Sequence, residues 1–434
     1  MNILEIIAKK RDKKELLKEE IDFFIEQYTC GNVTDYQAAA LIMAIYLNGM
    51  TNKEITNLTI AMAYSGEVLD LSQFGENVVD KHSTGGIGDK VTLILMPIIA
   101  ALGVPVAKMS GRGLGFTGGT IDKLESIPGY NTQISIEEFK NNVEKIGISL
   151  MGQTLNLAPA DKKIYALRDS ISCVENIPLI ASSIMSKKIA AGANKIVLEV
   201  TVGNGAFMKN IEDARKLSET MINIGKLAGK ETVCILTNMD EPLGYSIGNS
   251  LEVIEAVEAL QGDMEDDVKQ VVLELGSYMI KLSGKGDNIE ENKRKMVECI
   301  DSGMAYMKFL ELIENQGGDV SYINDISKFE NAKYVYPVLS DKIGYIKNIN
   351  AEKLGRISCD LGAGRLKKED VIDKNVGLII NKKIGDSVKK DDVLGIIHAN
   401  DEIKLKNAIN ELKSCFNICE EYVDKPKVIL GIME

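Results

Sequence analysis

The stretch AKMSGRGLGFTGGTIDKLESIPG, residues 107–129, decides the fold of this 434-residue chain. It begins at the end of a strand-like run, VPVAKMS (104–110), and continues with glycines and hydroxyl side chains. Glycines let backbone N–H groups approach an anion closely, and lysine and hydroxyl groups complete its coordination. The stretch DKHSTGGIGDK (80–90) repeats this combination and holds His82, one of only two histidines in the chain. Two such loops, each near a probable strand, predict one anion site at the carboxyl edge of a parallel sheet.

The residues of these loops alone leave other interpretations open. His82 could belong to an ordinary surface turn, and glycine-rich turns also occur without a ligand. The nucleotide P-loop spacing G-x-x-x-x-G-K-[ST] is missing. Asp122 and Glu125 lie about one helical turn apart, and we expect them to form structural ion pairs with Arg112 or Lys123.

Outward from the loops, short apolar runs alternate with helical stretches. KIVLEVTVG (195–203) and TVCILTNM (232–239) are rich in β-branched residues and bounded by turn residues, as strands are. Helices between such runs indicate α/β layering with a mostly parallel sheet. Residues 158–193 return to helical character, so they could rejoin an N-terminal bundle and make that domain discontinuous.

The two ends of the chain differ from its middle. Thr34 and Thr51 each begin a capping box before an apolar run, which predicts helices throughout the first sixty-odd residues. Residues 376–400 alternate strands and turns like biotinyl and lipoyl domains, but lack the methionine-flanked lysine that carries the cofactor there. The predicted fold class is therefore α/β and all-α, multidomain. It combines a helical domain, a mostly parallel α/β domain and a C-terminal α+β domain with a barrel-sandwich-like hairpin region.

Composition and charge limit the class of protein. A net charge of −12 argues against a sequence-independent nucleic-acid binder, which needs a basic face, but allows small anionic ligands. Seven scattered cysteines without zinc-finger spacing are typical of reduced thiols in a cytosolic protein. The N-terminus is charged within ten residues, and Pro97 and Gly103 break the longest apolar run, 93–107. We therefore expect a cytoplasmic protein whose partners include neither a membrane nor a nucleic acid.

A third cluster lies in the helical stretch. Tyr165 and Arg168 are three residues apart, and Ser183 and Lys187 are four apart, so each pair shares a helix face. A pyrimidine ring offers two carbonyl acceptors and an N–H donor along its edge, which an arginine, a lysine and a hydroxyl can satisfy. The same spacing also occurs on solvated helix faces, so the residues alone allow both interpretations.

These stretches together resemble a known family. DKHSTGGIGD (80–89), KMSGRGLGFTGGTIDKLESIPG (108–129), LAPADKKIYALRD (157–169) and SSIMSKK (182–188) are similar to the pyrimidine-nucleoside and thymidine phosphorylases. The resemblance covers nearly the whole chain. It implies a helical domain (1–67 and 160–190) that binds the pyrimidine and forms a homodimer. It also implies an α/β phosphate-binding domain (75–155 and 195–335) and a C-terminal α+β domain (345–434).

The resemblance also implies roles for single residues in a cleft between the first two domains. The implied phosphate-binding residues are Lys81, Ser83, Thr92, Lys108, Met109, Ser110 and Thr120. The implied pyrimidine-binding residues are Tyr165, Arg168, Ser183 and Lys187. His82 is expected near the pyrimidine O2, and with Arg168 and Lys187 it makes up the implied catalytic set. Inorganic phosphate is the co-substrate, and no organic cofactor is expected.

The implied reaction is reversible phosphorolysis of pyrimidine nucleosides to the free base and an α-pentose 1-phosphate. VAKMSGRG, with Lys108 before Met109, looks more like the broad-specificity branch, so uridine, thymidine and deoxyuridine are the expected substrates. A thymidine-restricted phosphorylase is the alternative. An enzyme like anthranilate phosphoribosyltransferase, which shares a similar fold, and a nucleoside sensor without turnover are the other rivals. Domain closure would use hinges at 190–194 and before Val78.

The chain departs from the family pattern in three places. Phe116 stands where a histidine is expected, which leaves His82 as the only plausible catalytic histidine. Lys90 and Ser246 fall where potassium-binding members carry other residues. The implied potassium site comprises Gly88, Lys90, Leu243, Ser246 and Glu255. The Lys90 ammonium could replace the ion, or the Lys90 side chain could point into solvent while the ion remains.

Overall fold

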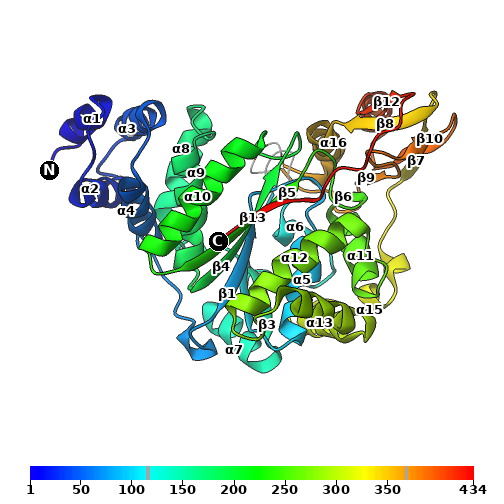
Figure 1. Ribbon diagram of the computed structural model, residues 1–434, viewed down its shortest axis with the longest axis horizontal. Coiled ribbons are helices and arrows are strands. Elements are labelled where there is room, and N and C mark those ends of the chain that lie inside the picture. Colours follow the sequence, from blue (N-terminus) through cyan, green and yellow to red (C-terminus); the bar gives the residue numbers. More distant parts are fainter. Residues whose placement is uncertain (114–117, 366, 368–369) are drawn as a thin grey trace.

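Helices from two separate parts of the chain form the helical domain (Figure 1). The computed structural model describes residues 1–113, 118–365, 367 and 370–434. The helices of this domain are α1 (Ile3–Arg11), α2 (Lys18–Thr29), α3 (Asp35–Asn48), α4 (Asn52–Ala63), α8 (Pro159–Ser170) and α9 (Ile177–Ala190). Thr34 and Thr51 begin α3 and α4 with capping boxes, as predicted. Ile164 and Leu179, from α8 and α9, belong to the apolar core of α1–α4, so the later helices do rejoin the bundle.

The central sheet has the strand order β1-β4-β5-β13. β1 (Val79–Ser83), β4 (Lys195–Val202) and β5 (Glu231–Asn238) run parallel, which confirms the mostly parallel sheet. β13 (Ile429–Met433) pairs antiparallel with β5. The last residues of the chain thus lie in the α/β sheet, whereas the sequence placed them with the C-terminal domain. Their backbone finds ladder partners on the free edge of β5.

Helices cover both faces of this sheet. The elements between the strands are α5 (Val91–Ala101), α6 (Thr120–Leu124), α7 (Ile136–Ile146), α10 (Ile211–Leu227), α11 (Asn249–Leu260), α12 (Asp266–Leu282), α13 (Ile289–Asp301), α14 (Met304–Asn315) and α15 (Ser321–Asn324). In Figure 1, α10 and α12 lie on opposite sides of the sheet. A separate parallel pair, β2 (Val106–Ser110) with β3 (Ile148–Gly152), stands beside it. The run 93–107 is buried helix followed by strand, as expected.

The C-terminal domain contains two open sheets. Their orders are β10-β8-β12 and β6-β9-β11-β7. The strands are β6 (Ser246–Gly248), β7 (Tyr334–Leu339), β8 (Gly344–Ile349), β9 (Gly377–Ile380), β10 (Ser387–Val388), β11 (Val393–Ala399) and β12 (Phe416–Cys419), with helices α16 (Ala351–Ser358) and α17 (Glu402–Lys413). The predicted strand-turn rhythm of 376–400 is present as β9, β10 and β11, divided between the two sheets. β6 belongs to the α/β part of the chain, so it ties that part to the C-terminal domain.

The chain crosses between the helical and α/β domains at three places that lie side by side. The Leu69 N–H donates to Ala190 O at 2.8 Å, and the Asn194 N–H donates to Val78 O at 3.1 Å. The Glu67 N–H donates to Asn156 O at 2.9 Å. The segment around Asn156, which is the third crossing, therefore also lies beside the segment before Val78. The predicted hinge segments are thus adjacent, as rotation about one axis requires, and the hinge motion stays a prediction.

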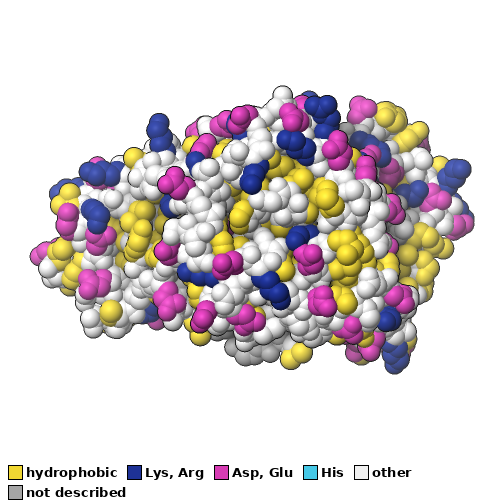
Figure 2. Space-filling view, turned by 90° about the horizontal axis from the view of Figure 1, so that it is seen from below, with side chains coloured by type: hydrophobic (Ala, Val, Ile, Leu, Met, Phe, Trp, Pro, Cys, Tyr) yellow, Lys and Arg dark blue, Asp and Glu magenta, His cyan; other side chains and the backbone are white. Residues whose placement is uncertain are grey.

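None of the helices in the described residues is long and apolar enough to span a membrane. On the face seen in Figure 2, acidic and basic side chains are interspersed with one another.

Candidate active site

A cleft of about 860 Å³ lies between the helical and α/β domains. Its α/β wall includes Ser110 at the end of β2 and Gly152 at the end of β3. Its helical wall includes Asp161 and Tyr165 on α8 and Lys187 on α9. Residues from two of the three sequence clusters therefore open into one cavity.

The strands that lead into the two glycine-rich loops contact each other, although β1 and β2 belong to different sheets. The Lys108 ammonium on β2 donates to Lys81 O on β1 at 2.7 Å. Thr92 lies in the first turn of α5, after the first loop, and Thr120 begins α6 after the second. The Met109 side chain is buried in an apolar cluster, so only its backbone can face an anion.

Lys81 is buried among carboxylates. Its ammonium lies 2.8 Å from Glu199 and 3.9 Å from Asp89. Burial and the nearby Asp89 charge raise the pKa of Glu199 despite the opposing effect of Lys81. Burial alone would lower the pKa of Lys81, but Asp89 and Glu199 raise it. Lys81 is therefore a cation, and an entering anion would compete with two carboxylates for it. The Ser83 hydroxyl adds a hydrogen bond to Asp89.

A second buried cluster is centred on Asp80, the residue before Lys81. Its carboxylate lies 2.7 Å from the Lys188 ammonium on α9 and 3.3 Å from that of Lys108. Burial would raise the pKa of Asp80, but the two lysines hold it below its usual value. Burial, with the charges of Lys188 and Lys81, lowers the pKa of Lys108 to about 7 against the pull of Asp80. The Asp80 carboxylate thus joins β1 and β2 to α9, the helix that carries Lys187.

His82 follows Lys81 on β1 and is half-buried. Burial lowers its pKa well below 6.5, and the surrounding charges of Lys188, Lys108, Lys187 and Lys81 lower it further. The imidazole is therefore neutral at physiological pH. A neutral imidazole offers one N–H donor and one acceptor nitrogen.

The helical wall holds Lys187 in a fixed position. Its ammonium lies 2.6 Å from Asp161 on α8 and 2.8 Å from the Ser183 hydroxyl, one turn earlier on α9. The predicted Ser183–Lys187 face is therefore present, and Asp161 is a partner that the sequence interpretation missed. Asp161 lies four residues before Tyr165, and that helical spacing is the signal that could have found it.

Arg168 lies below the cleft surface, unlike its expected place on the wall. Its side chain is 1% exposed, and its guanidinium donates to the carbonyl oxygens of Cys173, Leu179 and Val174. It also lies 5.8 Å from the centre of the Tyr165 ring. In this conformation Arg168 holds the turn between α8 and α9, while Tyr165 and Lys187 face the cleft.

Asp122 and Glu125 form the structural ion pairs that the sequence predicted. Arg112 bonds Asp122 at 3.1 Å and Glu125 at 2.5 Å. Arg365, which precedes the C-terminal strands β9–β12, reaches the same Asp122 at 2.9 Å. Phe116, the departure noted in the sequence, lies outside the described residues.

Comparison with known proteins agrees with this geometry. Residues 75–306 match the family model described as "Glycosyl transferase family, a/b domain". Residues 4–66 match its helical bundle domain, and residues 345–419 match the "Pyrimidine nucleoside phosphorylase C-terminal domain". The chain is 50% identical over 410 residues to the pyrimidine-nucleoside phosphorylase of Geobacillus stearothermophilus, covering 94% of this chain and 95% of the relative. This chain belongs to the pyrimidine-nucleoside phosphorylase family.

A second pyrimidine-nucleoside phosphorylase, from Bacillus subtilis (strain 168), is 50% identical over 402 residues, 93% of each chain. Membership of the pyrimidine-nucleoside phosphorylase family makes the chain an enzyme of the pentosyltransferase type, as the sequence indicated. The crystal structure of anthranilate phosphoribosyltransferase from Thermus thermophilus aligns with a TM-score of 0.60 at 19% identity, over 72% of this chain and 99% of that one. That likeness concerns the fold alone.

Proposed function

We propose that this pentosyltransferase catalyses the reversible phosphorolysis of pyrimidine nucleosides, with inorganic phosphate as co-substrate. The observation that carries the proposal is the shared cleft. Ser110, beside the buried lysines of β1 and β2, and Lys187, with its hydroxyl partner Ser183, open into the same cavity. Phosphate can therefore bind on the α/β wall and the nucleoside on the helical wall of the same cleft.

Phosphate binds at the carboxyl ends of β1 and β2 in this proposal. The Lys81 and Lys108 ammonium groups supply the positive charge, and Met109 contributes its backbone. The hydroxyl groups that complete the cradle are Ser83, Thr92, Ser110 and Thr120. Charge-assisted hydrogen bonds to an anion are each worth about 1.5–3 kcal/mol. That gain offsets the ion pair with Glu199 that Lys81 gives up.

The nucleoside lies against Tyr165 with its base edge toward Lys187 and Ser183. A phosphate oxygen attacks C1′ while the C1′–N1 bond breaks, and the base leaves with the bonding electron pair. The charge that develops on O2 and O4 is stabilised by Lys187 and by Arg168, once a side-chain rotation frees the guanidinium from its carbonyl partners. His82, as a neutral imidazole, donates a hydrogen bond from its ring N–H to O2 and so stabilises the charge that develops there.

The proposed substrates are uridine, thymidine and deoxyuridine, and thymidine restriction is the alternative. Absorbance-monitored phosphorolysis of the three nucleosides, with and without phosphate, tests both points. We expect release of free base only when phosphate is present, from all three substrates. Release from the deoxynucleosides alone would favour restriction, and binding without turnover would favour a sensor. Lys187→Met, which removes the ammonium from the cleft, serves as the inactive control.

We also propose that the enzyme is a cytoplasmic homodimer formed by its helical domain. Tyr36, Met43 and Leu47 lie on one face of α3 and are 75%, 37% and 72% exposed, an apolar strip that a second copy would cover. Light scattering should give twice the chain mass, and Leu47→Glu should shift the protein towards the monomer. A monomeric parent protein would contradict the proposal.

A further inference from the structure

The Lys90 side chain lies in a closed pocket between the first glycine-rich loop and the turn after β5. Lys90 precedes α5 and is completely buried. Its ammonium donates to Leu243 O at 2.6 Å and lies 3.1 Å from the Glu255 carboxylate on α11. A buried lysine is rare unless it is paired, so this arrangement is built around the charge.

Two glycines make room for the ammonium. A Cβ added at Gly88 would lie 2.5 Å from Leu243 O, 3.1 Å from Ser246 O and 3.4 Å from the Lys90 Nζ. A Cβ added at Gly244 would lie 2.6 Å from the same nitrogen and 2.0 Å from Glu255 Oε1. Both glycines have positive φ, which other residues rarely adopt. The pocket is thus lined by two carbonyl oxygens and one carboxylate, with the ammonium among them.

Oxygens of this kind are also ligands for alkali cations, because carbonyl groups can replace the hydration shell of potassium. The family resemblance places a potassium ion among these same residues. The residues present here do not fit that ion, since the Lys90 ammonium already occupies the space and contacts Leu243 O and Glu255 directly. A second cation beside a buried ammonium would meet like-charge repulsion in a site of low dielectric constant.

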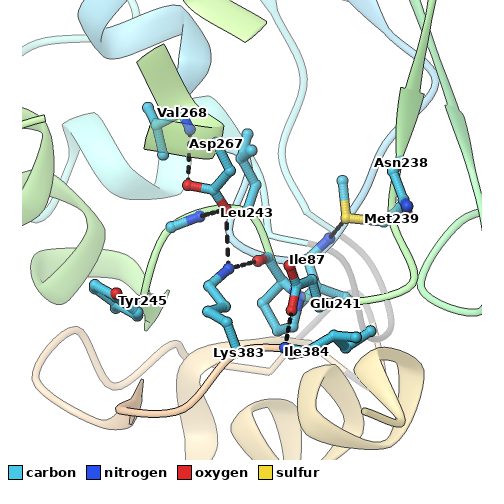
Figure 3. Close-up of polar contacts among 12 residues, drawn as sticks. Ile87, Asn238, Met239, Glu241, Leu243, Tyr245, Asp267, Val268, Lys383 and Ile384 are labelled. Carbon is cyan, nitrogen blue, oxygen red and sulfur yellow. Dashed lines mark hydrogen bonds and ion pairs between the residues drawn. The ribbon is translucent and has the colours of Figure 1, made fainter. Parts of the chain in front are cut away.

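The pocket joins the first loop to a turn that is itself firmly held. The Leu243 N–H donates to Ile87 O at 2.9 Å, which binds the turn to the loop. Figure 3 shows the other side of this turn, where Lys383 of the C-terminal domain reaches Asp267 at 2.9 Å and the carbonyl of Pro242. The Gly244 N–H donates to the same Asp267 at 3.0 Å. The Lys90 ammonium therefore joins the first glycine-rich loop to the turn after β5, which Asp267 and Lys383 hold in place.

The fastened loop bears directly on Lys81. Asp89, the neighbour of Lys90, lies 3.9 Å from the Lys81 ammonium and receives a hydrogen bond from Ser83. Asp89 O also accepts from Lys123 at 2.5 Å. A shift of the Gly88–Lys90 segment would displace the carboxylate that orients two of the proposed phosphate ligands.

We propose that the Lys90 ammonium is a covalently tethered monovalent cation that does the structural work of a bound alkali ion. The protein then needs no potassium, and removing the side chain exposes an oxygen-lined pocket that accepts a free monovalent cation. The consequence for phosphate binding rests on the proposed function, whereas the consequence for stability does not.

The experiment compares unfolding temperatures in sodium, potassium and tetramethylammonium chloride at equal ionic strength. We expect the unmodified protein to unfold at the same temperature in all three salts. Lys90→Thr, which keeps a residue suited to a helix N-terminus, should be destabilised in tetramethylammonium and regain stability with added potassium until the effect saturates. Isothermal titration with thallium(I), a spectroscopically and thermally convenient stand-in for potassium, should show one site in Lys90→Thr and none in the unmodified protein.

Two further variants separate the pocket from general effects. Lys90→Met fills the pocket without charge, so it should lose stability and show no response to potassium. Lys10→Thr removes another buried lysine, paired with Glu54 at 2.7 Å in the helical domain, and should likewise show no response. Saturable potassium stabilisation of the unmodified protein would overturn the proposal, as would a Lys90→Thr variant that behaves alike in all salts, whether folded or unfolded. Lack of phosphorolysis by the unmodified protein would instead contradict the proposed function and leave this inference standing.

Discussion

Replacing Asp80 with asparagine should destabilise the protein in a way that depends on pH. Asp80 is buried and pairs with both Lys188 and Lys108, at 2.7 and 3.3 Å. Asparagine keeps the shape but leaves the buried Lys188 ammonium and the buried Lys108 amino group without a carboxylate. Breaking a buried pair by removing one partner costs about 3–5 kcal/mol. We expect a loss of unfolding free energy in this range near pH 7.

The pH dependence follows from Lys108. Burial lowers its pKa from 10.5 to about 7, while Asp80 opposes the shift, so the variant should have a still lower value. The unfolded chain binds more protons than the folded one between the folded pKa and 10.5, so stability falls as pH decreases through that window. In the unmodified protein the unfolding free energy stops falling near pH 7. In Asp80→Asn it continues to fall below pH 7, because the pKa of Lys108 is lower there. Each further pH unit adds up to about 1.4 kcal/mol to the difference.

Urea unfolding at pH 6, 7 and 8 measures this difference. Glu54→Gln is the matched control, because it removes the carboxylate of the buried Lys10–Glu54 pair in the helical domain. The Glu54→Gln control should lose stability and keep its phosphate KM. Asp80→Asn should lose stability and also show a higher phosphate KM. A loss below about 1 kcal/mol, or an equal loss at pH 6 and pH 8, would refute the reasoning.

The other predictions concern turnover and phosphate binding. His82→Ala should lower turnover by roughly 10²–10³-fold, as loss of one hydrogen-bond donor to a developing negative charge does, with a smaller loss for nucleosides whose base is a better leaving group; equal losses across a leaving-group series would exclude a His82 hydrogen bond to the leaving base. Lys81→Ala should raise the phosphate KM tenfold or more, and Ser110→Ala should raise it less, as phosphate titrations at saturating nucleoside would show; an unchanged KM for Lys81→Ala would mean that the cradle is misplaced. Asp161→Asn, which removes the carboxylate charge beside the Lys187 ammonium, should raise the nucleoside KM more than the phosphate KM; a larger rise in the phosphate KM would contradict the assignment of Lys187 to the nucleoside. Because the pKa of Lys108 is about 7, phosphate binding at pH 7.5 should take up protons, seen in calorimetry as a binding heat that varies with the ionisation enthalpy of the buffer; a buffer-independent heat would exclude this.

The fold could be predicted largely because its signals are local. The capping boxes at Thr34 and Thr51 and the β-branched runs of β4 and β5 each depend on a few neighbouring residues. The place of β13 was missed for the opposite reason. Its pairing with β5 joins residues almost two hundred positions apart, and four apolar residues and a glycine near a chain end give no sign of their partner strand.

The candidate site was predictable in its cations and not in its carboxylates. Lysines and hydroxyls in glycine-rich loops suggest an anion directly, so Lys81, Lys108 and Ser110 stood out. Asp80 and Glu199 lie within strands, where a charged residue carries no indication of what it faces. Their positions follow only once burial is known, because a buried ammonium requires a counter-charge. The buried position of Arg168 was hidden in the same way, since its three carbonyl partners belong to the turn after α8.

The carboxylates also explain how a chain with a net charge of −12 can hold four lysines around one histidine. Lys81 pairs with Glu199 and Asp89, Lys108 and Lys188 share Asp80, and Lys187 pairs with Asp161, so four carboxylates face the four lysines. An entering phosphate therefore replaces carboxylate partners of the lysines. It does not enter a site of unpaired ammonium groups. Glu199, whose pKa burial already raises, is the carboxylate best suited to take a proton as the anion arrives. The carboxylates thus stabilise the buried lysines before the substrate binds. The neutral state of His82 follows from its burial first and from the surrounding ammonium groups second.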